Sequence, residues 1–389
     1  MALFFGYRRI QMKLLILNYE FPPVGGGGGV ASLQLAREFV RKGWQVDVIA
    51  SGFSGLSKFE NVNGIRVYRV PVVGRRHQTH SSMLALFTYV LSAFFLALRL
   101  CRREKYDHIN SHFAVPTGPL GHVLSRLYRI THTLSIHGGD IYDPSKKASP
   151  HRHWWLRKTV SYVLNTADHI IAQSQDTKKN AMKLYSPKKK IHVVPLPFEP
   201  IEYIQSTRAE LGLEENIVYM IAVGRLIRRK GFDDIARALT RLPENIHALI
   251  IGEGPERQYF QKIASEQGVS ERFHLLGFVE EQKKMQLLEA ADMYVLSSWH
   301  EGFGIVLQEA MQAGLPILAA DNGGQTDIIV DGVNGFYIRS HDPKSIATGV
   351  KKIIENAEMA QQISNTNRVA VVQFRADEIV QHYCDIMTS

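Results

Sequence analysis

Short apolar segments alternate with segments of helical length along most of the chain. Before residue 200 the apolar segments fall at 14–18, 45–50, 108–111, 133–136, 169–172 and 192–194. Helical patterns lie between them at 30–42, 120–128 and 154–165. Strands that alternate with helices of this length predict a parallel sheet with right-handed connections. The first half of the chain is therefore predicted to be a doubly wound α/β domain.

A proline-rich segment interrupts this alternation near the middle of the chain. Residues 195–201 read PLPFEPI, and its prolines exclude a helix or a central strand. The alternation then restarts, with strands predicted at 218–223, 248–251, 273–276, 293–296 and 317–319 and helices at 232–242, 256–267, 282–291 and 305–313. This pattern predicts two Rossmann-like doubly wound domains that face each other across a cleft. We place them at residues 1–196 and 197–370, with a C-terminal helix in residues 371–389 that packs back on the first domain.

Length and composition agree with this division. The chain has 389 residues, too many for one ordinary core, and its 45% hydrophobic and 21% charged residues exclude disorder, collagen and coiled coil. The two cysteines, Cys101 and Cys384, cannot form a disulfide framework or a cysteine-rich zinc site. We therefore expect a reducing, cytoplasmic compartment.

The beginning of the chain offers two start positions, Met1 and Met12. Residues 1–11 read MALFFGYRRIQ, so that Arg8 and Arg9 follow the apolar residues instead of preceding them as in a signal peptide. We interpret these residues as a translation-start artefact or as an extension outside the fold.

Charge is distributed unequally between the two halves. The net charge is +9, but residues 1–199 hold 28 Lys and Arg against 11 Asp and Glu, a net +17, while residues 200–389 hold 18 against 26, a net −8. Such asymmetry indicates different partners for the two halves, and an anionic partner for the first.

One segment of the basic half is unusually apolar. Residues 83–98 hold 14 apolar residues among 16, and Arg99, Arg102, Arg103 and Lys105 follow. A membrane span needs about 20 apolar residues, so we do not expect a full crossing. Two interpretations remain open. The segment is a helix of the core or of a domain surface, or it is an interfacial helix whose basic flank docks on anionic lipid, at the cytoplasmic face of the membrane.

The candidate chemistry of the second half begins at residues 297–314, SSWHEGFGIVLQEAMQAG. Glu301 and Gly302 lie in a loop between a predicted strand and a predicted helix. Backbone N–H groups in such a glycine loop and at a helix N-terminus bind anions. Glu309 lies inside the helix, where a carboxylate can accept two hydrogen bonds from a ribose diol.

Three further motifs follow predicted strands. Residues 224–231 read GRLIRRKG, from which Arg225 and Lys230 can reach a diphosphate. His137 and Asp140 belong to an HGGD sequence in the first half. Residues 25–29 are five glycines after the first strand, and these permit close approach of the backbone to a phosphate.

Together and in this order, these motifs resemble those of the family 4 glycosyltransferases of the GT-B fold. The likeness covers nearly the whole chain, because GEG at 252–254, GFV at 277–279, the E-x7-E spacing from Glu301 to Glu309, and the NGG and DGVNG turns at 322–324 and 331–335 also match. The linker departs from the PNGVD that is common in the family, since it reads PLPFE at 195–199.

The resemblance implies a role for each candidate residue. The nucleotide-sugar donor would be bound mainly by the C-terminal domain and the acceptor by the N-terminal domain. Arg225 and Lys230 would hold the diphosphate, with Gly224 in the same loop, and Glu309 would hold the ribose hydroxyls. The remaining donor-side residues are Gly28 and Gly29 at the phosphate, Gly277 and Phe278 at the base, Glu301 and Gly302 at the sugar, and the amides of Phe303, Gly304 and Ile305. His137 would support the positive charge that develops at the anomeric carbon. Asp140 and Phe21 are the acceptor-side candidates, and Asp140 would orient either His137 or the acceptor.

The resemblance also implies the type of reaction. The family retains anomeric configuration, and this chain lacks a D-x-D triplet, which predicts transfer without a metal ion or cofactor. A UDP-sugar is the favoured donor and GDP-mannose the second. The acceptor would be a hydroxyl of a glycan or lipid-linked saccharide in cell-envelope polysaccharide or glycolipid synthesis, and nucleic acid is not an expected partner.

Other functions fit less well. A nicotinamide-dependent oxidoreductase would need an acidic residue at the end of its second strand, where the chain reads Ile49-Ala50-Ser51, and the P-loop sequence of nucleotidases is absent. A GT-B sugar-nucleotide epimerase or hydrolase shares the architecture and remains an alternative. A non-catalytic membrane-surface protein would explain the basic half but not Arg225, Glu301 and Glu309.

Overall fold

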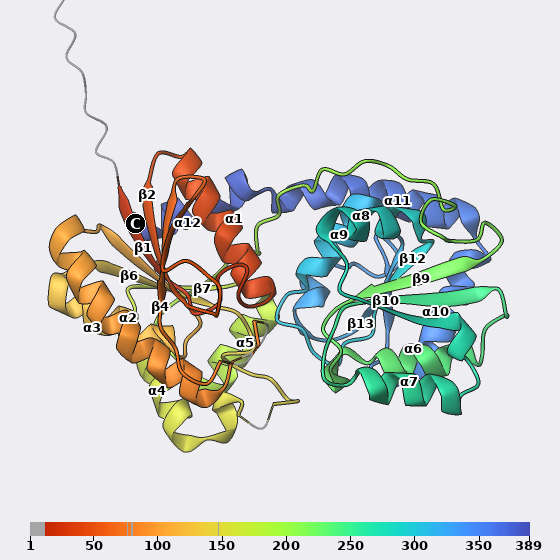
Figure 1. The fold of residues 1–389 in the computed structure, drawn as a ribbon, viewed down its shortest axis with the longest axis horizontal. Coiled ribbons are helices and arrows are strands. Elements are labelled where there is room, and N and C mark those ends of the chain that lie inside the picture. The colour runs from red at the N-terminus through yellow and green to blue at the C-terminus, as the bar shows by residue number, and fades with distance from the viewer. Residues whose placement is uncertain (1–11, 76, 79–80, 147) are drawn as a thin grey trace, which may run out of the picture.

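The computed structural model describes residues 12–389 except 76, 79–80 and 147. Two α/β domains, each built around one sheet, lie side by side (Figure 1). The choice between Met1 and Met12 concerns residues 1–11, which lie outside the described residues.

The N-terminal domain contains an eight-stranded sheet in the order β3-β4-β2-β1-β5-β6-β7-β8. Its strands are β1 (Lys13–Leu17), β2 (Gln45–Ser51), β3 (Phe59–Val62), β4 (Ile65–Val70), β5 (His108–His112), β6 (Thr131–Ile136), β7 (His169–Ala172) and β8 (Ile191–Val193). Its helices are α1 (Gly27–Arg41), α2 (Met83–Glu104), α3 (Thr117–Tyr128), α4 (Trp154–Thr166) and α5 (Gln175–Tyr185). The six predicted strands are present with ends shifted by at most two residues, and all strand pairs are parallel except the β3–β4 hairpin.

The C-terminal domain contains a six-stranded parallel sheet in the order β11-β10-β9-β12-β13-β14. Its strands are β9 (Val218–Val223), β10 (Ile246–Ile251), β11 (Phe273–Gly277), β12 (Met293–Leu296), β13 (Ile317–Ala320) and β14 (Phe336–Ile338). Its helices are α6 (Phe232–Leu239), α7 (Arg257–Glu266), α8 (Glu281–Ala290), α9 (Ile305–Ala313), α10 (Pro343–Ile354) and α11 (Ala357–Ala370). The predicted α/β class is confirmed in both halves.

Both faces of the N-terminal sheet are covered, which explains why β1 is a nearly continuous apolar run, although β5 beside it buries the polar residues His108, Asn110, Ser111 and His112. Along β1, Leu14 and Ile16 pack with α1 on one face, whereas Leu15 and Leu17 pack with α2 and α3 on the other. This alternation follows from the two-residue period of a strand. Helices α4 and α5 continue the second layer, since α3 packs on α4 and α4 on α5.

The last helix, α12 (Ala376–Met387), belongs to the core of the N-terminal domain. It packs on α1, and Tyr383 lies against Phe39 with ring centroids 6.4 Å apart. The chain crosses between the domains twice, and the two crossings are hydrogen-bonded, because the amide of Phe198 donates to the carbonyl of Phe374 at 2.7 Å. In the first crossing, Leu196 and Phe198 each stand next to a proline, and both are buried against the C-terminal core.

Candidate active site

The strand order places the candidate motifs at the switch points of the two sheets. In each sheet the direction of winding reverses between two neighbouring strands, β1 and β5 in one and β9 and β12 in the other. Open α/β sheets bind ligands outside the carboxyl ends of such strands. The glycine run follows β1, the GRLIRRKG loop follows β9, and the EGFG loop follows β12. The three motifs therefore lie where a ligand is expected.

Three residues of the glycine run form the first turn of α1 and not a loop. A Cβ atom at Gly27 would lie 3.2 Å from Cγ2 of Ile305, which begins α9 in the other domain. A Cβ at Gly28 would lie 2.9 Å from the Phe113 ring. The N-termini of α1 and α9 thus approach each other across the domain boundary, and each presents backbone N–H groups and a positive dipole end. Gly29 is buried against the carbonyl of Glu20, so its missing side chain serves packing.

The start of α9 is also free of side-chain caps. Gly304 is its N-cap residue with φ of 101°, a left-handed conformation that favours glycine, and no side chain bonds the first amides. The ring of Phe303 is 2% exposed and packs in the C-terminal core. The buried Phe303 ring therefore anchors the EGFG loop, while the backbone of the loop faces the other domain.

The HGGD loop is held by Asp140, which is buried. One carboxylate oxygen accepts a hydrogen bond from the amide of His137 at 2.9 Å and the other from the amide of Ala114 at 2.6 Å. Burial raises the pKa of Asp140 to about 6, although these amide donors oppose the rise. Of the roles predicted for Asp140, this geometry fits the orientation of His137.

His137 stands in a chain of buried polar groups. Its Nε2 lies 2.9 Å from Nδ1 of His112, and its Nδ1 lies 3.0 Å from Oε1 of Gln173. Because Oε1 can only accept, His137 must carry its proton on Nδ1, and its Nε2 then accepts from His112. Nε2 of His112 has no partner within the described part of the chain, as suits an unprotonated imidazole nitrogen. The Nε2 group of Gln173 also donates to the carbonyl of His137.

Both histidines are neutral at physiological pH. Burial lowers the pKa of His137 to about 4 and the pKa of His112 well below its usual value. Both ring nitrogens of His137 are used within the protein, so the ring is not arranged as a general acid or base. The chain instead fixes the loop and the orientation of its carbonyl.

A buried cluster of charge lies on the C-terminal side. Nζ of Lys230 lies 2.5 Å from Oε1 of Glu301, and Nη1 of Arg229 lies 3.4 Å from the other carboxylate oxygen. Burial by itself would raise the pKa of Glu301, but Lys230 and Arg229 outweigh it and lower the pKa to about 2. Gly224 makes room for Lys230, because a Cβ there would lie 3.1 Å from Cε of the lysine.

Glu309 pairs with a lysine from the neighbouring helix. Its Oε1 lies 2.8 Å from Nζ of Lys284 on α8, and both side chains are largely buried. Burial raises the pKa of Glu309, while Lys284 opposes the rise. The second carboxylate oxygen, Oε2, is buried and has no hydrogen-bond partner among the residues that the structure describes. A buried oxygen without a partner calls for an explanation, and a bound ligand or water molecule is one.

The remaining predicted residues divide into three groups. Arg225 lies at the end of β9, and burial lowers its pKa. Gly277 ends β11, and Phe278 beyond it is 75% exposed, which leaves the ring free to contact a ligand. Phe21 is different, because it is 1% exposed and packs in the N-terminal core. The prediction that Phe21 lies on the acceptor side of the site is therefore wrong, because its ring offers no surface to a ligand.

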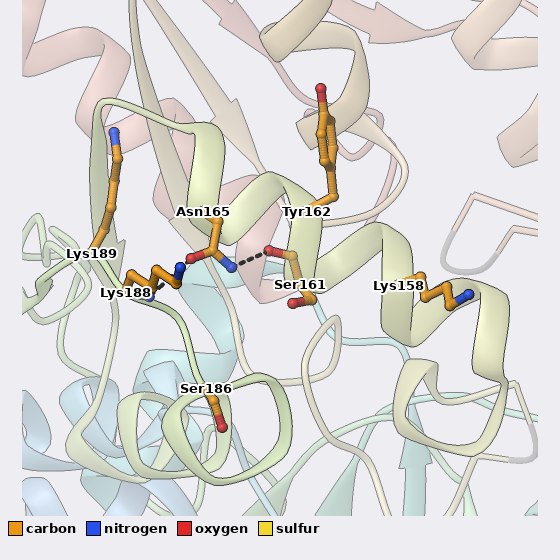
Figure 2. Close-up of a pocket in the computed structure, with 7 residues that line it drawn as sticks. All are labelled: Lys158, Ser161, Tyr162, Asn165, Ser186, Lys188 and Lys189. Carbon is orange, nitrogen blue, oxygen red and sulfur yellow. Dashed lines mark hydrogen bonds between the residues drawn. The ribbon is translucent and has the colours of Figure 1, made fainter.

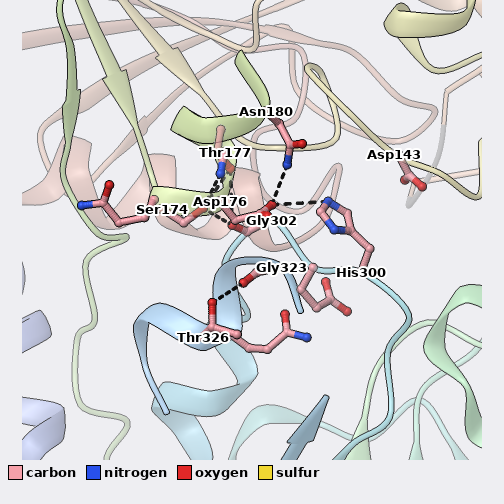
Figure 3. Close-up of polar contacts among 12 residues, drawn as sticks. Asp143, Ser174, Asp176, Thr177, Asn180, His300, Gly302, Gly323 and Thr326 are labelled. Atoms are coloured by element: carbon pink, nitrogen blue, oxygen red, sulfur yellow. Dashed lines mark hydrogen bonds and ion pairs between the residues drawn. The ribbon is translucent and has the colours of Figure 1, made fainter. Parts of the chain in front are cut away.

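The two domains touch directly beside these groups (Figure 3). Oγ of Ser174, which caps α5, donates to the carbonyl of Gly302 at 2.7 Å. His300 lies 3.9 Å from Asp176, and Arg229 lies 3.8 Å from Asp143. The HGGD loop of one domain also packs against the EGFG loop of the other, since a Cβ atom at Gly138 would lie 2.7 Å from Cα of Gly302.

Sequence reasoning missed the partners of its own candidates. His112, Gln173 and Lys284 each contact a predicted residue but lie outside the predicted motifs, and Arg229 lies in the GRLIRRKG motif without having been predicted as a site residue. Arg229 and Lys284 carried a weak signal, since each is a cation in or near a loop at a strand end. In the part of the chain that the structure describes, no group of three or more His, Cys, Asp or Glu residues lies close enough together to hold a metal ion.

Solved structures of similar shape define the class. Sucrose-phosphate synthase of Thermosynechococcus elongatus superposes with a TM-score of 0.85 at 19% identity, covering 96% of this chain and 98% of that one. HepE of Anabaena, solved with UDP and glucose, superposes with a TM-score of 0.79 at 22% identity, covering 97% and 100%. The fold is GT-B, the architecture of two Rossmann-like domains seen in one large class of glycosyltransferases.

Comparisons of sequence then give the family. The model for glycosyl transferases group 1 matches residues 204–369, and that for glycosyltransferase family 4 matches residues 25–200. An uncharacterized glycosyltransferase of Methanocaldococcus jannaschii is 30% identical over 380 residues, which cover 93% of this chain and 94% of that protein. The chain belongs to the family 4 glycosyltransferases, as its motifs predict.

Proposed function

We propose that this glycosyltransferase transfers a hexose-type sugar from a UDP-sugar to a hydroxyl of a glycan or lipid-linked acceptor, with retention of configuration and without a divalent metal ion. The proposal rests on one observation above all. The buried Lys230–Glu301 pair lies at the carboxyl ends of the switch strands of one domain, where the uncapped N-termini of α1 and α9 meet.

This arrangement suits a departing diphosphate. Lys230 has three N–H donors and uses one on Glu301, which leaves two for phosphate oxygens. Arg225 and the helix N-termini add fixed positive charge, and preorganised charge of this kind stabilises a leaving group without a metal ion. The unpartnered Oε2 of Glu309 would accept the ribose hydroxyls. UDP is favoured as nucleotide because HepE, which has the same fold, binds it.

The transfer needs no nucleophile from the protein. The acceptor oxygen bonds to the anomeric carbon on the face from which the diphosphate leaves, and the bond from that carbon to the diphosphate oxygen breaks. The acceptor proton passes to the departing oxygen, so that UDP and the glycoside are the products. His137, neutral and held by Asp140 and Gln173, would present its carbonyl dipole to the positive charge that develops on the sugar.

A thermal-shift screen of UDP-glucose, GDP-mannose and ADP-glucose in EDTA tests the donor. A ligand at a hundred times its dissociation constant stabilises a protein by about 2.7 kcal/mol, so the preferred donor will be evident. We expect UDP-glucose to give the largest shift and the anomeric proton of the product to keep the donor's configuration in NMR spectra. A shift that needs Mg²⁺ would contradict metal independence. Release of UDP with no glycoside formed would favour the epimerase or hydrolase alternative.

A further inference from the structure

Helix α2 exposes large apolar side chains to solvent. Three of its six buried residues are alanines, Ala85, Ala93 and Ala97, and the others are Tyr89, Leu100 and Cys101. The outward face carries five large apolar side chains that are 52%, 53%, 63%, 46% and 69% exposed: Met83, Leu84, Phe87, Leu91 and Phe95. A surface helix of a domain normally turns its polar side outward. Packing within this chain therefore does not explain the outward face of α2.

The apolar surface continues over the next two helices. Helix α2 packs on α3, α3 packs on α4, and the three follow one another along the lower left of the N-terminal domain (Figure 1). Helices α3 and α4 add five exposed apolar or aromatic residues: Val123, Leu127, Trp154, Trp155 and Tyr162. We call the outward surface of these three helices the α2–α4 face. Tryptophan and tyrosine are enriched where proteins meet the interface between a membrane and water.

The α2–α4 face is basic as well as apolar. Its three helices hold six exposed basic side chains: Arg99, Arg102, Arg103, Arg126, Arg157 and Lys158. Their one acidic residue, Glu104, lies at the end of α2 and pairs with Lys13 and Arg66. Lys158 and Lys188 also line an open pocket between α4 and the turn that follows α5 (Gln175–Tyr185) (Figure 2). Anionic headgroups complement this combination of exposed cations and aromatic rings.

The apolar end of the face lies beside the active site. Helices in a parallel sheet run against the strands that precede them, so α2 and α4 begin at the edge where the strands end. Val73, just after β4, donates its amide to Thr88 near the start of α2, whereas Glu104 at its other end pairs with Lys13 at the start of β1. The exposed Phe87 and Trp154 therefore lie at the edge of the sheet from which His137 projects.

We infer that the α2–α4 face docks the enzyme on an anionic membrane surface, with the active site opening beside the lipid headgroups. Helix α2 is long and apolar enough to cross a membrane, since its most apolar stretch has a mean hydropathy of 2.0, but 33% of that stretch is buried in the domain. The Tyr89 hydroxyl also donates to the Ile49 carbonyl inside the core at 2.9 Å. Docking keeps these contacts and covers only the outward residues. A symmetric dimer through the same face would instead bring six cations against six cations.

Vesicle co-sedimentation of the full chain tests the inference. We expect binding to phosphatidylcholine vesicles that contain phosphatidylglycerol, little binding to phosphatidylcholine alone, and weakening by salt. Phe87→Ser with Phe95→Ser should reduce binding at least tenfold, and Arg126→Gln with Lys158→Gln should do so on the order of tenfold. Matched controls on the C-terminal domain are Ile204→Ser with Val369→Ser, which are 73% and 74% exposed, and Lys344→Gln with Lys351→Gln.

Tryptophan fluorescence provides a second measurement. Trp154 and Trp155 are the exposed tryptophans, at 72% and 46%, so docking should shift the emission to the blue in wild type and not in Trp154→Phe with Trp155→Phe. Equal binding by the face variants and the controls would overturn the inference. The inference would also be overturned if the wild type bound no anionic vesicle but formed a dimer, and if the double variant Phe87→Ser with Phe95→Ser dissociated that dimer. Unchanged melting temperatures will show that the variants fold.

Discussion

Nζ of Lys230 lies 2.5 Å from Oε1 of Glu301, so the residues predicted to bind the diphosphate and the sugar of the donor bind each other. Their exposed side-chain fractions are 12% and 11%, and the pair joins the loop after β9 to the loop after β12. The carboxylate thus holds the lysine in place before a ligand arrives. Such preorganisation is what electrostatic catalysis requires.

Loss of the lysine should therefore destabilise the protein as well as weaken donor binding. Lys230→Met leaves the Glu301 carboxylate buried with Arg229 alone, and we expect the free energy of unfolding to fall by about 3 kcal/mol. Urea denaturation measures this change. The double variant Lys230→Met with Glu301→Gln removes both charges and should recover at least half of the loss. A single variant as stable as wild type would show that the pair is not structural.

The pair also predicts how stability depends on pH. The pKa of Glu301 is about 2 in the folded protein against 4.5 ordinarily, so its stabilisation is present above pH 4.5 and is lost as the pH falls towards 2. The difference in free energy of unfolding between wild type and Glu301→Gln should shrink by about 3 kcal/mol across that window. Urea titrations at several pH values measure it. A difference that stays constant would show that Glu301 keeps its ordinary pKa in the folded protein.

The buried histidine chain predicts an effect on turnover and not on donor binding. Gln173→Leu removes the partner of both the ring and the carbonyl of His137, so we expect kcat to fall at least tenfold while KM for the donor changes little. Gln373→Leu, at an exposed position after α11, serves as the control. Because the pKa of His137 is about 4, kcat should not follow a histidine titration near pH 6.5. A rise in KM alone would assign Gln173 to binding.

Close packing between the domains predicts a strong effect of one methyl group. A Cβ atom at Gly302 would lie 2.4 Å from the carbonyl oxygen of His137, closer than side chains tolerate. Gly302→Ala should therefore push the EGFG and HGGD loops apart and reduce kcat/KM about a hundredfold, because small displacements of catalytic groups have effects of that size. Steady-state kinetics measure it. Activity near that of wild type would mean that the loops do not pack this way during turnover.

The sequence was informative about the fold because most buried strands contain a short run of apolar residues, with β5, which reads HINSH, as an exception. The clearest omission is the β3–β4 hairpin, although Asn63-Gly64 between the strands is a strong hairpin signal and both residues have positive φ. The start of α1 was also placed too late. Glycine has low helix propensity, but the close approach of Gly28 to Phe113 favours a helix with no side chains there.

Motifs located the candidate site but not its internal contacts. The positions of Lys230, Glu301 and Glu309 followed from strand ends and spacing. Their pairing with each other or with Lys284 depends on side-chain packing between segments far apart in the sequence, which spacing does not encode. Phe21 shows the opposite error, since it was predicted at the acceptor side but its ring is buried in the N-terminal core.

The most direct test of the account is a calorimetric titration of UDP in the presence of EDTA. Wild type should bind UDP without a metal ion, and Glu309→Ala should bind it at least tenfold more weakly, because a hydrogen bond to a charged group contributes about 1.5–3 kcal/mol. Glu266→Ala, at an exposed position on α7, should bind like wild type. Equal affinity of Glu309→Ala and wild type, or no binding until Mg²⁺ is added, would contradict the proposed donor site.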